Sequence, residues 1–237
     1  MARTDLHTDE AGPAESPSSP PQSPPRPNLL WTWPQYAMQV LFTVGLRYRA
    51  RGVERVPKTG GGLLLCNHQS SLDPFLVGLP LPRPVSYLAR DSLFRLPLIG
   101  RLMRHNYVIP ISRESAATSS VRAAVERLRR GLLVGLFPEG TRSRDGRVGA
   151  MKPGFVALVR RGNVPVIPVG IAGAHEVLPR GAWLPRPRTV RVVFGPAFLP
   201  SEIERLTERG REEEFVALVR ERIEKCRNEA DAWRKGT

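Results

Sequence analysis

An imidazole and a carboxylate stand five residues apart in the stretch Asn67-His68-Gln69-Ser70-Ser71-Leu72-Asp73. A carboxylate that accepts the Nδ1 proton of a histidine fixes the tautomer of the ring and leaves Nε2 free to take a proton from a hydroxyl. His68 and Asp73 could therefore activate an alcohol for attack on an acyl carbon. The alternative is structural, because Asp73 before Pro74 also suits the N-cap of a helix.

A second motif follows about seventy residues later and reads Phe137-Pro138-Glu139-Gly140-Thr141-Arg142-Ser143. Proline and glycine favour a turn that exposes backbone amides. The planar guanidinium of Arg142 suits a phosphate group. The motif therefore predicts an anion-binding loop, and the alternative is an ordinary turn with a solvated arginine.

Together the two motifs resemble those of the glycerolipid acyltransferase family, in particular its 1-acylglycerol-3-phosphate (lysophosphatidate) acyltransferases. Two weaker family blocks follow in the right order, Tyr107-Val108-Ile109-Pro110-Ile111-Ser112-Arg113 and Val164-Pro165-Val166-Ile167-Pro168-Val169. The first of these departs from the family at its start, where glycine is frequent, and before the arginine, where an acidic residue is frequent. The resemblance covers roughly residues 50 to 200.

The resemblance implies transfer of a fatty acyl group from acyl-CoA or acyl carrier protein to the free hydroxyl of the lysophospholipid 1-acylglycerol 3-phosphate, giving phosphatidate in phospholipid biosynthesis. It assigns His68 as the general base and Asp73 as the group that orients it. The residues that it places around the acceptor phosphate are Arg113, Glu139, Gly140, Thr141 and Arg142. No covalent acyl-enzyme is required, and we expect no cofactor beyond the acyl donor.

The charge of the chain predicts an anionic partner. The sequence of 237 residues has 36 Lys and Arg against 22 Asp and Glu, a formal net charge of +14. Membrane phospholipids fit this balance, although a general preference for arginine would explain part of it. Nucleic acid is not expected, because the basic residues are scattered, aromatic residues are few and no nucleic-acid-binding motif is present.

Cysteines and histidines are sparse. Cys66 and Cys226 are distant from each other and imply no disulfide framework, so a reducing compartment is the simpler assumption. No group of histidines and cysteines has the spacing of metal ligands, so we predict no metal site.

The N-terminal part of the chain divides into two segments. Residues 1–28 form a Pro/Ser-rich tail that we expect to be disordered. Residues 29–50 begin with an uncharged apolar stretch bearing tryptophans and end in arginines, which predicts a membrane-associated helical segment. A core helix is the alternative. The expected location is the cytoplasmic side of the cell membrane, with peripheral, monotopic or single-helix attachment.

Residues 51–237 are predicted to be the acyltransferase domain, ending in helices. Apolar runs predict strands at residues 62–66, 85–89, 107–111, 132–137, 164–171 and 189–194. Helical segments are expected at residues 74–79, 120–130, 153–161 and 212–225, with a capping box opening another helix at Ser201. Alternating strands and helices predict an α/β fold with a largely parallel central sheet flanked by helices. Both motifs then follow strands, where such folds bind ligands.

Two alternatives stay open. One keeps the chemistry and changes the acceptor to glycerol 3-phosphate or another lysophospholipid. The other is a non-catalytic, basic membrane-binding protein on the same scaffold.

Overall fold

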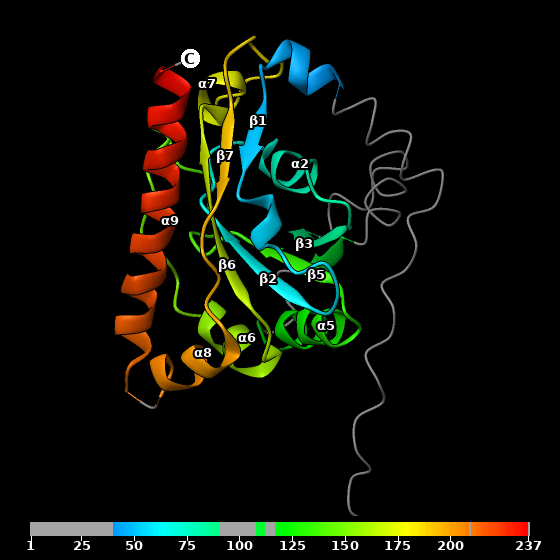
Figure 1. Ribbon diagram of the computed structural model, residues 1–237, viewed down its shortest axis with the longest axis vertical. Helices are drawn as coiled ribbons and strands as arrows, with labels where there is room; N and C mark the ends of the chain where they lie inside the picture. Colours follow the sequence, from blue (N-terminus) through cyan, green and yellow to red (C-terminus); the bar gives the residue numbers. More distant parts are fainter. Residues whose placement is uncertain (1–39, 91–107, 112–116, 209, 237) are drawn as a thin grey trace, which may run out of the picture.

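A seven-stranded sheet forms the centre of the protein, in a computed structural model that describes residues 40–90, 108–111, 117–208 and 210–236 (Figure 1). The strand order is β1-β7-β6-β2-β5-β3-β4. Of these neighbouring pairs, β6 and β7 run antiparallel and the others run parallel. The bounds of the strands are β1 Arg49–Arg51, β2 Gly62–Cys66, β3 Val85–Arg90, β4 Ile109–Ile111, β5 Leu133–Leu136, β6 Val166–Ala172 and β7 Arg191–Phe194.

Helices cover both faces of the sheet (Figure 1). Their bounds are η1 Val53–Arg55, α2 Asp73–Gly78, α5 Ala117–Arg129, α6 Phe155–Gly162, α7 Ala174–Val177, α8 Pro200–Leu206 and α9 Glu212–Lys235. Because both faces are covered, every residue of β2 is buried. Along β2, Leu64 and Cys66 pack in the core with α2 and α7, while Leu63 and Leu65 pack in the core with α5, α6 and α9. The predicted α/β fold with a mostly parallel sheet is confirmed.

The longest helix, α9, lies directly against β6 and β7. A Cβ atom built on Gly170 of β6 would overlap the backbone of Cys226 and Arg227 in α9. Phe215, Val219 and Ile223 of the same helix are buried. These apolar residues belong to the core beneath the helix, and the helix extends ten residues beyond the predicted end, to Lys235.

Each of the six predicted strands overlaps an observed strand, with β3 and β6 ending one residue later than predicted, but β1 was missed. Arg49 to Arg51 alternate between exposed and half-buried positions at the edge of the sheet, where an apolar run is not required. The end of the segment predicted to be helical, residues 29–50, therefore enters a strand. The helix predicted to be capped at Ser201 begins earlier, at Pro200, and the Glu202 carboxylate accepts the N–H of Leu199 at 2.8 Å.

Part of the predicted membrane segment is described, and residues 40–45 are helical. Phe42 packs in the core, whereas Val40, Leu41 and Val44 are exposed. Within the described residues, we find no helix with both the length and the apolar character to cross a membrane. The tail predicted at residues 1–28 lies outside the described residues.

Candidate active site

The strand order brings the two motifs to one edge of the sheet. β2 lies between β5 and β6 and runs parallel to both, so the segments that follow these three strands begin side by side. The first motif follows β2 and the second follows β5. In open parallel sheets this carboxyl edge is where ligands bind.

Asn67 fastens the first motif to the neighbouring strand. Its side-chain amide donates to the Ile171 carbonyl at 3.0 Å and accepts the Ile171 N–H at 2.7 Å. Asn67 is fully buried, and this pair of bonds imitates one step of a sheet beyond the end of β2. His68 therefore leaves the sheet from a fixed backbone position.

Asp73 is the acceptor around which the His68 loop folds. Its Oδ2 accepts three hydrogen bonds, from His68 Nδ1 at 2.8 Å, from the Gln69 N–H at 2.6 Å and from the Ser70 N–H at 2.7 Å. The last two donors precede α2, so Asp73 does not cap its own helix, as the structural alternative required. With Nδ1 engaged in this way, the neutral ring keeps its proton there and presents Nε2 as a base.

The carboxylate of Asp73 is shielded from water. Its carboxylate is fully buried, and burial raises the pKa of Asp73 above its ordinary value. The hydrogen bonds from His68, Ser70 and Gln69 act in the opposite direction because they stabilise the ionised form. A carboxylate that is desolvated and paired in this way is suited to stabilise an imidazolium.

Aromatic rings support the other side of His68. The imidazole stacks on Phe137, with ring centroids 4.2 Å apart and an angle of 21° between the planes. Tyr87 of β3 stacks in turn on Phe137 at 5.8 Å. The His68 side chain stays about one-fifth exposed, and its Nε2 forms no hydrogen bond to any other described residue. The ring is thus oriented but open to a substrate.

Glu139 joins the two motifs through backbone groups. One carboxylate oxygen accepts the N–H of His68 at 2.9 Å, and the other accepts the N–H of Gly149 at 3.0 Å. The Ser143 N–H adds a bond to the His68 carbonyl at 2.7 Å. Burial raises the pKa of Glu139, and the two bonds to backbone N–H groups partly counter that effect. This positioning role was not foreseen from the sequence, which placed Glu139 only beside the acceptor.

The turn of the second motif carries the predicted phosphate ligands. Gly140 has a φ of 66° and donates its N–H to the Phe137 carbonyl at 3.0 Å, which closes the turn. Thr141 is exposed, and Arg142 is half-buried. Arg142 forms no ion pair or hydrogen bond with the rest of the described chain. Its guanidinium therefore stays available for an anion.

Lys152 is a second cation at this turn, and no motif in the sequence pointed to it. A Cβ atom on Gly140 would lie 3.1 Å from Lys152 Nζ, so the lysine side chain runs over the glycine. The Lys152 N–H donates to the Pro138 carbonyl at 2.9 Å, which fixes the start of that side chain. The sequence signal was weak, because a lysine before Pro153-Gly154 reads as a loop residue.

Arg113 lies outside the described residues, so its predicted contact with phosphate stays a prediction. The structure does bring together His68, Asp73, Glu139, Gly140, Thr141 and Arg142. In the part of the chain that the structure describes, no three His, Cys, Asp or Glu side chains are grouped as metal ligands would be.

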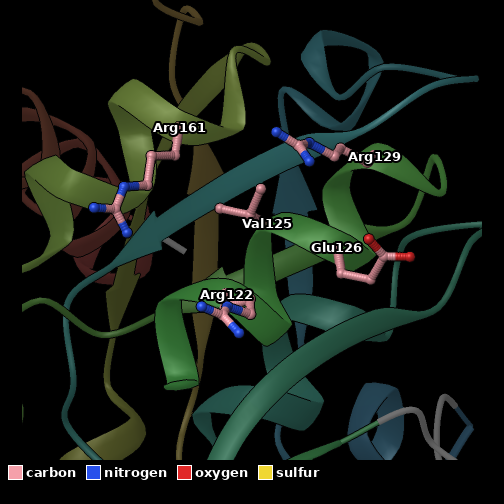
Figure 2. Close-up of a pocket in the computed structure, with 5 residues that line it drawn as sticks. All are labelled: Arg122, Val125, Glu126, Arg129 and Arg161. Carbon is pink, nitrogen blue, oxygen red and sulfur yellow. The ribbon is translucent and has the colours of Figure 1, made fainter. Parts of the chain in front are cut away.

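A hollow of about 260 Å³ lies elsewhere, between α5 and α6 (Figure 2). Four of its lining residues share one face of α5 and the fifth belongs to α6; they are Arg122, Val125, Glu126, Arg129 and Arg161. None of them belongs to either motif. We therefore do not place the chemistry there.

Comparison with known proteins agrees with this geometry. The family model described as Acyltransferase matches residues 47–172, more than half of the chain. The chain belongs to this acyltransferase family.

Several relatives carry the name 1-acyl-sn-glycerol-3-phosphate acyltransferase. One from Limnanthes douglasii is 32% identical over 66% of this chain, which spans 56% of that relative. One from Pseudomonas aeruginosa is 31% identical over 70% of this chain and 65% of its own length. One from Bacillus subtilis is 24% identical over 82% of this chain and 96% of its own length.

A solved structure has the same fold. The crystal structure of the 1-acyl-sn-glycerophosphate (LPA) acyltransferase PlsC from Thermotoga maritima matches with a TM-score of 0.71. It is 25% identical in sequence, and the match covers 85% of this chain and 81% of that one.

Proposed function

We propose that the protein transfers a fatty acyl group from a thioester donor, acyl-CoA or acyl carrier protein, to the free hydroxyl of 1-acylglycerol 3-phosphate. The product is phosphatidate. The observation that carries the proposal is the hydrogen bond between His68 Nδ1 and the buried Asp73, which leaves Nε2 unpaired beside the second motif. The names of the relatives support the same acceptor.

The reaction needs one base and no nucleophile from the protein. His68 Nε2 takes the hydroxyl proton while the oxygen attacks the thioester carbonyl carbon. Asp73 stabilises the imidazolium that forms. The tetrahedral intermediate then collapses, the carbon–sulfur bond breaks, and the proton passes from His68 to the departing thiolate. The ring returns to its starting state.

A mechanism with a cysteine nucleophile is less well supported. Cys66 is fully buried at the end of β2, and burial raises the pKa of its thiol. A thiol held in its neutral form is a weak nucleophile. Direct transfer is therefore preferred over an acyl-cysteine intermediate.

Backbone amides at the second turn are the best candidates to stabilise the oxyanion. The N–H groups of His68, Gln69, Ser70, Gly140 and Ser143 already have acceptors. Those of Thr141 and Arg142 have none within the described residues. A well-aimed donor of this kind contributes about 3 kcal/mol to the transition state.

The acceptor phosphate is assigned to Arg142, with Lys152 beside it and Arg113 as the predicted third cation. Arginine and lysine suit a phosphate monoester because both carry a full charge and several donors. The substrate is a membrane lipid, so we also propose attachment to the cytoplasmic side of the membrane through residues 29–45.

An acceptor panel tests the proposal. The purified protein is incubated with labelled acyl-CoA or acyl carrier protein and with lysophosphatidate, glycerol 3-phosphate, lysophosphatidylcholine or monoacylglycerol. We expect phosphatidate to form fastest, and Arg142→Ala to raise the KM for lysophosphatidate while Arg129→Ala on α5 leaves it unchanged. Faster reaction with another acceptor would show that lysophosphatidate is not the preferred substrate. No product with any acceptor would favour a non-catalytic membrane-binding protein.

A further inference from the structure

Two large apolar side chains project from a loop between α7 and β7. Trp183 is 95% exposed and Leu184 is 80% exposed. The loop is closed by hydrogen bonds from the Arg186 N–H to the Val177 carbonyl at 2.7 Å and from the Ala182 N–H to the Pro179 carbonyl at 3.0 Å. A folded loop therefore exposes both side chains to solvent. Side chains of this type are more often buried in the protein interior.

A second apolar surface lies at the same end of the molecule. Residues 40–45 form a short helix next to the end of this loop, at the top of Figure 1. The Val190 N–H donates to the Leu46 carbonyl at 3.1 Å, and the Arg49 N–H donates to the Val190 carbonyl at 3.3 Å. On this helix the exposed apolar residues are Val40, Leu41 and Val44. Two segments far apart in sequence thus lie near each other at one end of the molecule, and each exposes apolar side chains.

The surroundings of Trp183 are cationic. Arg180, Arg186 and Arg188 are exposed on the same loop. No acidic residue occurs from Val177 to Ser201. Tryptophan prefers the boundary between lipid headgroups and acyl chains, and arginine is attracted to anionic headgroups. This combination fits a bilayer surface better than it fits water.

The loop is connected to the catalytic loop. The Ser70 hydroxyl donates to the Leu178 carbonyl at 3.1 Å, and the Ser70 N–H donates to Asp73. The residue that begins the exposed loop therefore contacts the segment that holds His68. A contact between this loop and a membrane would place the active site close to lipid.

We infer that Trp183 and Leu184 insert into the headgroup region of an anionic bilayer beside helix 40–45, so that the protein docks at two points and takes its acceptor from the bilayer. The choice of a bilayer rests on the proposed function, since a lysophospholipid acceptor resides there. An acidic protein, such as an acyl carrier protein, is the competing partner for a basic surface.

Vesicle binding tests the inference directly. The full chain is floated with phosphatidylcholine vesicles that contain phosphatidylglycerol, and the double variant Trp183→Ser/Leu184→Ser is compared with it. We expect the affinity of the double variant to fall about tenfold. We expect Arg186→Ala/Arg188→Ala to lower it about fivefold for each charge removed. The matched control is Leu199→Ser, which removes a 53% exposed leucine next to α8 at the opposite end of the molecule.

Activity separates the two partners. The double variant should lose rate with lysophosphatidate embedded in vesicles and keep its rate with a short-chain, monomeric lysophosphatidate. Native-like vesicle binding by the double variant, or an equal loss in Leu199→Ser, overturns the inference. So does a loss confined to acyl carrier protein as donor, which would make this a protein-binding surface. The flotation result does not depend on turnover, so it stands whatever the acceptor panel shows.

Discussion

One carboxylate oxygen of Asp73 accepts three hydrogen bonds, which makes Asp73 both the partner of the His68 ring and the centre of the loop that carries His68. A change at Asp73 therefore acts on chemistry and on local structure together. The two effects can be separated because one is measured as a rate and the other as a free energy of unfolding.

Asp73→Asn should lower kcat/KM on the order of 10³–10⁴-fold, because a neutral amide is a weaker acceptor for the Nδ1 proton and carries no charge to stabilise the imidazolium. The free energy of unfolding should fall by about 1–3 kcal/mol, since the Gln69 and Ser70 N–H groups lose a charged acceptor. Steady-state kinetics and urea denaturation measure the two. Asp145→Asn, which alters an exposed carboxylate, is the control and should change neither. Full activity in Asp73→Asn would contradict the assigned role.

The raised pKa of Glu139 predicts how the stability of the protein changes with pH. Burial raises its pKa above 4.5 in the folded state, so the native protein binds this proton more tightly than the unfolded chain does. The contribution of Glu139 to stability is therefore greatest below pH 4.5 and declines as pH rises through the raised pKa. Glu139→Gln has no such proton.

The free energy of unfolding of the native protein minus that of Glu139→Gln should therefore decrease as the pH rises through the raised pKa of Glu139. Urea denaturation of both proteins at a series of pH values measures it. An increase with pH would show that the bonds to His68 and Gly149 outweigh burial.

At the scale of elements, the sequence predicts apolar strands well and misses the one strand whose residues are mostly charged. The strands β2, β5 and β6 were found because each is a continuous apolar run covered on both faces. Strand β1 was missed because an edge strand made of Arg-Ala-Arg has no such signal. Its pairing with β7 is a tertiary contact that no local pattern records.

Tertiary contacts in the candidate site likewise leave no local signal in the sequence. The spacing of His68 and Asp73 was enough to predict their meeting, because both follow one strand closely, His68 in the loop and Asp73 at the start of α2. The links of Glu139 to His68 and Gly149, and the approach of Lys152 to Gly140, join residues that are up to 71 positions apart. Such links depend on how loops pack against each other, which no local pattern in the sequence reveals.

The packing of α9 on β6 can be tested at Gly170. Gly170→Ala places a methyl group where the backbone of α9 lies, so the helix must shift. We expect a loss of about 1–3 kcal/mol in the free energy of unfolding. Gly154→Ala is the matched control, because a Cβ there meets no atom within 4 Å and the backbone is already helical. Equal stability of Gly170→Ala and the native protein would contradict the packing described.

At the scale of the whole molecule, a net charge of +14 accompanies exposed apolar side chains on helix 40–45 and the Trp183 loop. Electrostatic attraction to anionic lipid is screened by salt, with a Debye length of about 10 Å at 0.1 M and about 3 Å at 1 M. Binding to anionic vesicles should therefore weaken steeply between these salt concentrations. The remaining binding should approach that measured on neutral phosphatidylcholine vesicles. Flotation over a salt series measures this, and salt-independent binding would assign the attachment to apolar contacts alone.

The proposed reaction depends most on His68 acting as the base in acyl transfer to a lysophosphatidate hydroxyl. The direct measurement is the single-turnover rate of labelled phosphatidate formation by His68→Ala, with its thermal unfolding and lysophosphatidate binding measured in parallel. We predict a rate lower by about 10²–10⁴-fold, with unfolding and binding close to those of the native protein. A rate equal to that of the native protein would contradict this assignment, because a group other than His68 would then have to take the hydroxyl proton.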